Sequence, residues 1–122
     1  MKKIVGIRGA TQCRNEAEDI IHQVSALYEG LLNINNLAEP DIVSIIFSVT
    51  SDLDAKNPAA ALRSTGHAGQ TPLFAVQEAA IVGSLERVIR ILMHCYLNEA
   101  ASPLHLYRNG AEVLRPDFPT EV

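Results

Sequence analysis

The sequence predicts an α+β fold in which a mixed β-sheet packs against helices. Three observations carry this prediction: a β-branched run at Ile42–Thr50, apolar residues at helical spacing from Ile20 to Leu31, and an Asn109-Gly110 pair between two short apolar segments. The segments follow one another along 122 residues without an internal repeat. A chain of this length supports one core, so we expect a single domain over residues 1–122, with a short flexible tail from about residue 118.

The first elements are expected to be a strand and a long helix. Residues 3–8 alternate loosely and stop at Gly9, which predicts a strand followed by a turn. Asn15 and Glu18 have the spacing of a capping box, which predicts the start of the helix. The polar cluster Asn33–Pro40 ends it.

The middle of the chain predicts two strands separated by a short helix. Ile42–Thr50 has the composition of a buried strand. The dipeptide Asn57-Pro58 predicts an N-cap with proline at the first helical position, and this helix carries Arg63 and ends near Gly66. The segment Thr71–Glu78 is expected to be a third strand that ends on an acidic residue.

The last third of the chain is less uniform. Residues Leu85–Leu97 fit a helix by spacing and a strand by composition, so periodicity leaves both open. Leu106–Arg108 and Ala111–Leu114 flank Asn109-Gly110, which predicts a β-hairpin with a type I′ turn, before the chain turns at Arg115-Pro116. A sheet of such strands in so short a chain would leave a face or an edge uncovered, and oligomerisation is the usual remedy.

Composition excludes several classes of function. The formal charge of −4 argues against a nucleic-acid groove, which needs a dense positive surface. The one long apolar run is interrupted by charged residues, which argues against a membrane span, and the N-terminus lacks the pattern of a signal peptide, so a cytoplasmic location is expected. Cys13 and Cys95 stand apart without a metal-ligand or disulfide pattern, so reduced, structural thiols and no metal are predicted.

The residues that could carry chemistry are arginines. The chain has no GxSxG, P-loop, GxGxxG or HExxH motif, which removes the common nucleophilic, nucleotide-binding and metalloprotease mechanisms. Arg90 lies in the apolar run VIRILM, where an unpaired guanidinium is costly to desolvate, so it requires an anionic partner, either an acidic residue of the chain or a ligand. Seven of the ten basic residues are arginines, whose planar forks match carboxylates, so a few of them could bind a small dianion.

An ordered set of short motifs resembles the AroH-type chorismate mutases. Each motif is weak alone, but the set runs through nearly the whole chain in the order of that family. The motifs are GIRGAT at 6–11, SVTSDLDA at 48–55, PAAALR at 58–63, VQE at 76–78, GSLERVIR at 83–90, HLY at 105–107 and VLRPD at 113–117.

The resemblance implies a function and a set of site residues. It implies a cofactor-free isomerase that converts chorismate to prephenate, with three subunits joined in a barrel-like homotrimer and active sites at the subunit clefts. It resolves Leu85–Leu97 as a strand. Arg8, Arg90 and Tyr107 would hold carboxylate and ether oxygens of the substrate, and Glu78 would accept a hydrogen bond from its ring hydroxyl.

Four further positions are expected at the pocket. Arg63 and Arg115 match arginines near the family's site, although exposed arginines at the ends of helices and strands are also ordinary. Asn57 stands where the family usually has phenylalanine, and Ala75 where it has cysteine or another small polar residue. The first change removes an apolar wall and the second a possible hydrogen bond, so substrate affinity is where this chain is expected to differ from its relatives.

Two other functions remain as alternatives. A trimeric imine hydrolase of the Rid type would share the barrel-like trimer and bind a carboxylate through arginine, although its C-terminal pattern is absent from this sequence. A non-catalytic module that senses chorismate or an aromatic metabolite could use the same arginines. Low turnover with retained binding would favour the sensor.

Overall fold

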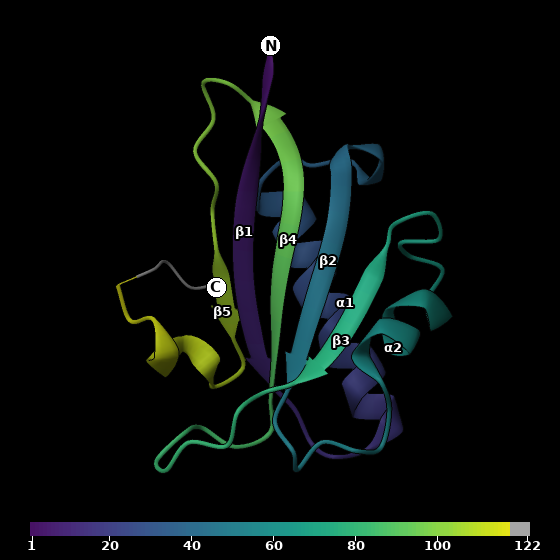
Figure 1. Ribbon diagram of the computed structural model, residues 1–122, viewed down its shortest axis with the longest axis vertical. Coiled ribbons are helices and arrows are strands. Elements are labelled where there is room, and N and C mark those ends of the chain that lie inside the picture. The colour runs from purple at the N-terminus through teal and green to yellow at the C-terminus, as the bar shows by residue number, and fades with distance from the viewer. Residues whose placement is uncertain (118–122) are drawn as a thin grey trace.

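The computed structural model describes residues 1–117 and shows one five-stranded mixed sheet in the order β3-β2-β4-β1-β5. Figure 1 shows α1 behind the sheet and α2 beyond the β3 edge, while neither α-helix lies over the near face. The predicted α+β class is therefore confirmed. The elements are β1 (Lys2–Gln12), α1 (Ala17–Ile34), η1 (Glu39–Asp41), β2 (Ile42–Val49), α2 (Pro58–Ser64), β3 (Leu73–Gln77), β4 (Val88–Asn98), β5 (Leu106–Arg108) and η2 (Ala111–Leu114).

The first strand is longer than predicted because Gly9 is a packing residue and not a turn residue. β1 runs on through Gly9 to Gln12 and pairs with β4 in antiparallel register over its whole length. A Cβ at Gly9 would lie 2.9 Å from the carbonyl oxygen of Leu106 and 3.0 Å from Cδ1 of Leu27. Glycine in a strand often marks such a close approach, and the expected turn at Gly9 is wrong.

The predicted capping box does not form. The N-cap of α1 is Glu16, without a side-chain cap hydrogen bond. The side-chain Oδ1 of Asn15 instead accepts hydrogen bonds from the backbone N–H groups of Asp54 and Ala55, both at 3.0 Å. Asn15 thus holds the loop before α2, and the helix begins at Ala17 without its help.

The middle of the chain forms the elements that its sequence predicts. β2 and β3 are parallel neighbours, and α2 lies between them in the chain. Oδ1 of Asn57 accepts from the N–H groups of Ala59 at 2.8 Å and Ala60 at 3.3 Å, so Asn57 is the N-cap and Pro58 the first helical residue, as predicted. This cap fixes the start of α2 beside the edge strand.

The ambiguous segment Leu85–Leu97 forms a strand, β4, that begins at Val88. It lies at the centre of the sheet and pairs antiparallel with both β1 and β2. A central strand has one face against the helices and one face away from them. Alternate residues of β4 from Ile89 to Leu97 are buried, while Arg90 and its alternates are more exposed.

The predicted hairpin after residue 106 is wrong. Asn109 and Gly110 do have the positive φ angles that the pair predicted, 53° and 100°. The chain beyond them forms the 3₁₀ helix η2, and β5 pairs with β1 in parallel register. The Asn109 side chain donates to the carbonyl oxygen of Gln12 at 2.7 Å, so the turn is tied to β1 and not to a second hairpin strand.

The core lies between the helices and one face of the sheet. Its largest fully buried side chains include Tyr28 and Leu27 of α1 and Phe47 of β2. The opposite face, here called the open face, carries exposed apolar side chains, and it also carries the functional residues described below. None of the helices in the described part of the chain has the length and apolar character required to cross a membrane. The exposed apolar residues of the open-face strands include Ile4, Ile46, Phe74, Val76 and Tyr96.

Candidate active site

Three of the predicted site residues meet at one pocket of the open face. Strand alternation directs the side chains of Arg8 in β1, Arg90 in β4 and Tyr107 in β5 away from the helices. The pocket has a volume of about 210 Å³. It is lined by Arg8, Gly9, Ile46, Ser48, Arg90, Ile91, Leu92 and Tyr107.

Arg90 finds its anionic partner in Glu78. Nε of Arg90 donates to Oε1 of Glu78 at 2.7 Å, and the Ser48 hydroxyl donates to the same oxygen at 3.2 Å. The register explains the meeting: Ser48 of β2 lies opposite Arg90 of β4, and the Glu78 N–H donates to the carbonyl oxygen of Val49 just after β3 ends. The predicted ion pair within the chain therefore exists, and it lies where the resemblance places the substrate.

The environment of Arg90 corrects one premise of the sequence reading. Its side chain is 41% exposed and that of Glu78 is 18% exposed, so the guanidinium is not buried in the apolar run. The neighbouring Ile89 and Ile91 face the core instead. Arg90 thus has donors left for a ligand, because Glu78 engages only its Nε among the described residues.

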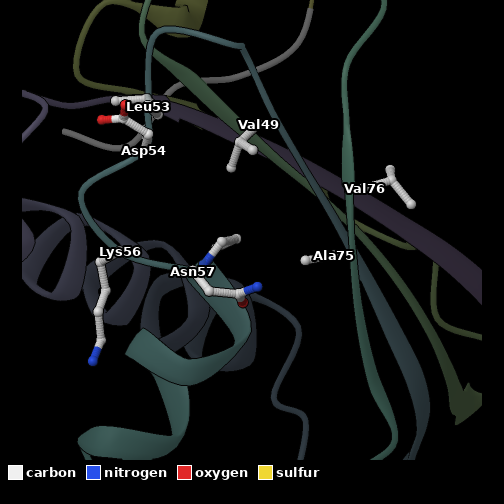
Figure 2. A pocket seen from close by; sticks show the side chains of 8 residues that line it. Val49, Leu53, Asp54, Lys56, Asn57, Ala75 and Val76 are labelled. Carbon is white, nitrogen blue, oxygen red and sulfur yellow. The ribbon is translucent and has the colours of Figure 1, made fainter.

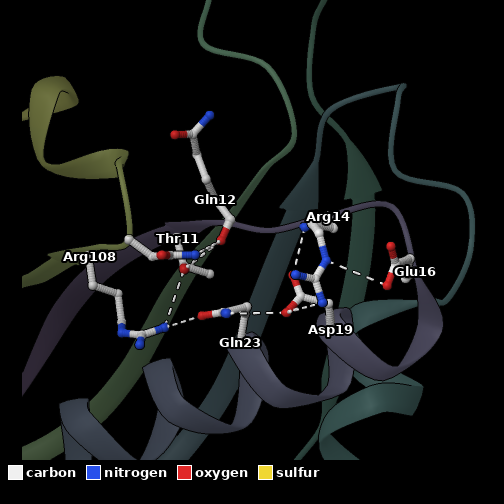
Figure 3. Close-up of polar contacts among 8 residues, drawn as sticks. Thr11, Gln12, Arg14, Glu16, Asp19, Gln23 and Arg108 are labelled. Atoms are coloured by element: carbon white, nitrogen blue, oxygen red, sulfur yellow. Dashed lines mark hydrogen bonds and ion pairs between the residues drawn. The ribbon is translucent and has the colours of Figure 1, made fainter.

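Tyr107 is held with its ring against the sheet. It is buried and packs with Ala10, Val88 and Ala111, and it lines the pocket as well. The next residue, Arg108, points to the helix side, where its Nη1 donates to Oε1 of Gln23 at 2.5 Å (Figure 3). Because this bond to α1 holds Arg108 on the helix side of β5, the preceding residue, Tyr107, points to the open face.

Arg8 and Arg115 lie at one end of this site. The Arg8 side chain is exposed, and its backbone N–H donates to Nδ1 of His105 at 2.9 Å. Arg115 binds Asp117 through two donors, Nε at 3.0 Å and Nη2 at 2.7 Å. The pKa of Asp117 is lowered, chiefly by its hydrogen bonds with Arg115, with a smaller effect from the charge of Arg8.

Asn57 and Ala75 line a different pocket of the same chain. This second pocket, of about 260 Å³, lies between the start of α2 and the edge strand β3. Figure 2 shows the Asn57 side chain directed toward Ala75, with Lys56 pointing away from both. Within one chain these two residues therefore stand apart from the pocket that holds Arg90. The lining is Val49, Leu53, Asp54, Lys56, Asn57, Pro58, Ala75 and Val76.

Arg63 does not line either pocket. It lies near the end of α2, and its Nη2 donates to the carbonyl oxygen of Thr71 at 3.0 Å. This bond ties α2 to the residues just before β3. In one chain Arg63 thus has a structural partner, and a role toward a ligand is not visible there.

Sequence reasoning missed two residues: Ser48, which lines the first pocket, and His105, which contacts the backbone of Arg8. Ser48 binds Glu78, and the signal for it was a hydroxyl at an alternate position of an otherwise apolar strand. His105 binds the backbone of Arg8. A lone histidine before Tyr107 gave no pattern that would have paired it with a residue about a hundred positions earlier.

The cysteines are separate from this site. Cys13 and Cys95 are free and buried, and burial raises the pKa of each thiol to about 11. Such thiols are poor nucleophiles at neutral pH. Residues 1–117 also hold no group of three or more histidine, cysteine or acidic side chains placed to bind a metal ion.

The fold and the pocket together define the class of protein: a small α+β protein that presents arginines and one carboxylate on the open face of a mixed sheet. Residues 4–118 match the family model described as chorismate mutase type I. The chain belongs to this family, and it is therefore an isomerase.

Individual relatives agree with the family model. The chain is 34% identical over 117 residues to the chorismate mutase AroH of Bacillus subtilis, covering 94% of this chain and 92% of that protein. It is 35% identical over 116 residues to chorismate mutase AroH of Thermus thermophilus, covering 93% and 94%. A solved chorismate mutase from Clostridium thermocellum superposes with a TM-score of 0.82 at 41% identity, covering 89% of this chain and 98% of that one. Neither alternative function, imine hydrolase or sensor, is favoured by these matches.

Proposed function

We propose that the chain isomerises chorismate to prephenate in the biosynthesis of phenylalanine and tyrosine, and that Arg90, Glu78 and Arg8 are its catalytic centre. The observation that carries the proposal is that Arg90, which pairs with Glu78 at 2.7 Å, lines one pocket of the open face together with Arg8. Substrate carboxylates are bound by guanidinium forks, and Arg8 and Arg90 supply two of them.

The reaction requires what these residues provide. One carbon–oxygen bond breaks as one carbon–carbon bond forms within a single molecule, so the step needs no nucleophile and no proton transfer. The protein has two tasks: to hold the enolpyruvyl arm over the ring, and to stabilise negative charge developing on the ether oxygen. Arg90 is placed for the second task, Arg8 and Tyr107 for binding, and Glu78 for accepting a hydrogen bond from the ring hydroxyl.

The site is completed, in this proposal, by a second copy of the chain. Asn57 and Ala75 line a pocket at the β3 edge, away from Arg90, and the open face between carries exposed apolar residues such as Phe74 and Val76. An apolar sheet face is stabilised by covering it. Three copies that pack these faces together would bring the Asn57 pocket of one copy to the Arg90 pocket of the next. Arg63 would then lie near the substrate, with Arg115 at the end of the Arg90 pocket.

The assembly has a direct test. Phe74 is 66% exposed on the open face, so Phe74→Lys should abolish the homotrimer, because a lysine charge in an apolar interface is costly to desolvate. We expect monomers by light scattering and a loss of activity of about tenfold or more. Ile34→Lys, at an exposed apolar position on α1, is the matched control and should stay trimeric. A monomeric, fully active wild type would contradict the shared site.

The activity itself is tested by following chorismate with ultraviolet absorbance, using pure protein without an added cofactor. The proposal expects chorismate to disappear at a rate proportional to protein concentration and prephenate to accumulate. If chorismate is not consumed but raises the melting temperature, the chain is a sensor. If neither occurs and an imine substrate is hydrolysed instead, the chain is an imine hydrolase.

The position of Ala75 allows a prediction about affinity. Ala75→Ser places a hydroxyl in the second pocket, and one neutral hydrogen bond to the substrate would lower KM about 2- to 10-fold. Ala100→Ser, at an exposed site after β4, is the control and should leave KM unchanged. Equal KM values for Ala75→Ser and wild type would place Ala75 outside the substrate site.

Two wider features follow as proposals. We place residues 1–122 in one domain, supported by the single sheet and by a family model that spans residues 4–118; the tail expected from residue 118 lies outside the described residues.

The cytoplasmic location is supported by Cys13 and Cys95, which are unpaired thiols of the kind that a reducing compartment maintains.

A further inference from the structure

The backbone of Arg8 is held by an imidazole where a strand neighbour is missing. β5 pairs with β1 in parallel from Gly9 onward, opposite Leu106, so the ladder begins one residue after Arg8. At Arg8 the backbone N–H donates instead to Nδ1 of His105 at 2.9 Å. An acceptor at Nδ1 carries no proton, so the neutral ring must carry its proton on Nε2.

His105 is itself fixed in place on both sides. The preceding residue, Leu104, exchanges two hydrogen bonds with the side chain of Asn35 at the end of α1, at 2.8 and 2.9 Å. The following residue, Leu106, is buried in β5. The ring therefore has little freedom to leave the Arg8 amide, and the hydrogen bond fixes the start of β5 relative to β1.

We propose that His105 is a positioning residue for substrate binding: its neutral Nδ1 fixes the backbone of Arg8, and so aims the Arg8 guanidinium into the pocket beside Arg90. This inference rests on the proposed role of Arg8. It assigns a function to a residue that lies within the HLY motif but does not line the pocket.

The charges around His105 determine its response to pH. The positive charges of Arg8 in β1 and Arg115 beyond η2 act on the ring, and Asp117 is hydrogen-bonded to Arg115 and is affected by the charge of Arg8. The pKa of His105 is held below its ordinary value, first by burial and then by the positive charges of Arg8 and Arg115. The ring therefore stays neutral at neutral pH. As pH falls below the ordinary histidine pKa toward this lower value, the ring gains a proton, the acceptor is lost, and the stability that it contributes is lost with it.

The decisive comparison is between two variants. His105→Ala removes the acceptor and leaves the Arg8 N–H unsatisfied, so we expect kcat/KM to fall about tenfold, mostly through KM, because Arg8 binds the substrate in the ground state and the transition state alike. His105→Asn keeps an uncharged acceptor at the position of Nδ1 and should stay within about threefold of wild type. His22→Ala, at an exposed histidine of α1, is the control and should change nothing.

The pH profile separates positioning from general stability. As the pH falls below the ordinary histidine pKa of about 6.5 toward the lower pKa of His105, the wild type should lose kcat/KM faster than His105→Asn, because asparagine does not titrate. If His105 had only a structural role, His105→Ala would have a lower melting temperature, but kcat/KM of the wild type and of His105→Asn would fall in parallel as the pH decreases. The proposal is overturned if His105→Ala matches wild type within twofold, or if His105→Asn is as impaired as His105→Ala.

A measurement without substrate keeps this result apart from the proposed reaction. Nitrogen NMR of the imidazole should show the proton of His105 on Nε2 at neutral pH, with a pKa below the ordinary histidine value. A proton on Nδ1 overturns the inference whether or not chorismate is consumed. If the tautomer is as expected but the wild type does not consume chorismate, the proposed reaction is wrong, while the hydrogen bond by which His105 positions Arg8 is still supported.

Discussion

Replacing Arg90 by methionine should lower kcat at least about 100- to 1000-fold, the loss seen when one donor to a developing oxyanion is removed, or about 3 to 4 kcal/mol. Methionine keeps much of the side-chain length and loses the charge and the donors. Arg90 lies beside Arg8 at the pocket with only Nε bound to Glu78, so its remaining donors are those that a substrate ether oxygen and carboxylate can use. Steady-state kinetics with chorismate measure the loss.

Two further variants decide whether geometry or charge matters at this position. Arg90→Lys keeps the positive charge but cannot present two parallel donors, so it should also be severely impaired. Arg14→Met removes an arginine that is 72% exposed and bound to Glu16 outside the pocket, and it should retain full activity. A loss of less than about tenfold for Arg90→Met would refute the role of Arg90 in the transition state.

The elements that the sequence predicted well are those whose pattern is local. Asn57-Pro58 carries the whole signal for the start of α2 within a few residues, and the N-cap is found there. The composition of Ile42–Thr50 likewise predicts β2 almost to the residue. The segment that became β4 was open because its spacing fits a helix while its composition fits a strand, and its place between β1 and β2 in the sheet decides it.

The predictions that failed depended on contacts distant in sequence. Gly9 predicts a turn locally, yet the carbonyl oxygen of Leu106 and the side chain of Leu27 require glycine within a continuous strand. Asn109-Gly110 does form a positive-φ turn, but β5 finds its partner in β1 at the other end of the chain. No local pattern indicates such a partner.

The site residues also differ in how far the sequence alone could predict them. Arg90 was identifiable because a charge in an apolar strand needs a partner; the partner exists, although the premise of a buried guanidinium was wrong because alternation leaves Arg90 partly exposed. Arg8 and Glu78 were expected only by resemblance, and the register of β2, β3 and β4 brings Glu78 to Arg90. Asn57 and Ala75 stay in a second pocket of the single chain, so their role depends on the proposed neighbouring copy.

The pairing of Arg90 with Glu78 leads to the other large expected effect. Glu78→Ala removes the acceptor that aims Nε of Arg90 and binds the Ser48 hydroxyl, and it removes the proposed acceptor for the ring hydroxyl. A hydrogen bond to a charged group contributes about 1.5 to 3 kcal/mol, so kcat should fall about 10- to 150-fold. The loss should fall on kcat and not on KM, because removing a negative charge from the pocket favours binding of a dianion.

The stability of the variants separates this catalytic role from a structural one. Arg90 is 41% exposed, so losing its partner does not strand a buried charge, and Glu78→Ala should change the free energy of unfolding by less than about 1 kcal/mol. Glu78→Gln keeps an oxygen acceptor for Arg90 and should lose less activity than Glu78→Ala. Glu86→Ala breaks a similar exposed ion pair, with Arg87 at 3.0 Å, and should leave kcat unchanged. If Glu78→Ala loses stability and activity in proportion, Glu78 has a structural role. If Glu78→Ala retains wild-type kcat, Glu78 has no catalytic role. In either case the proposed catalytic centre consists of Arg8 and Arg90 alone.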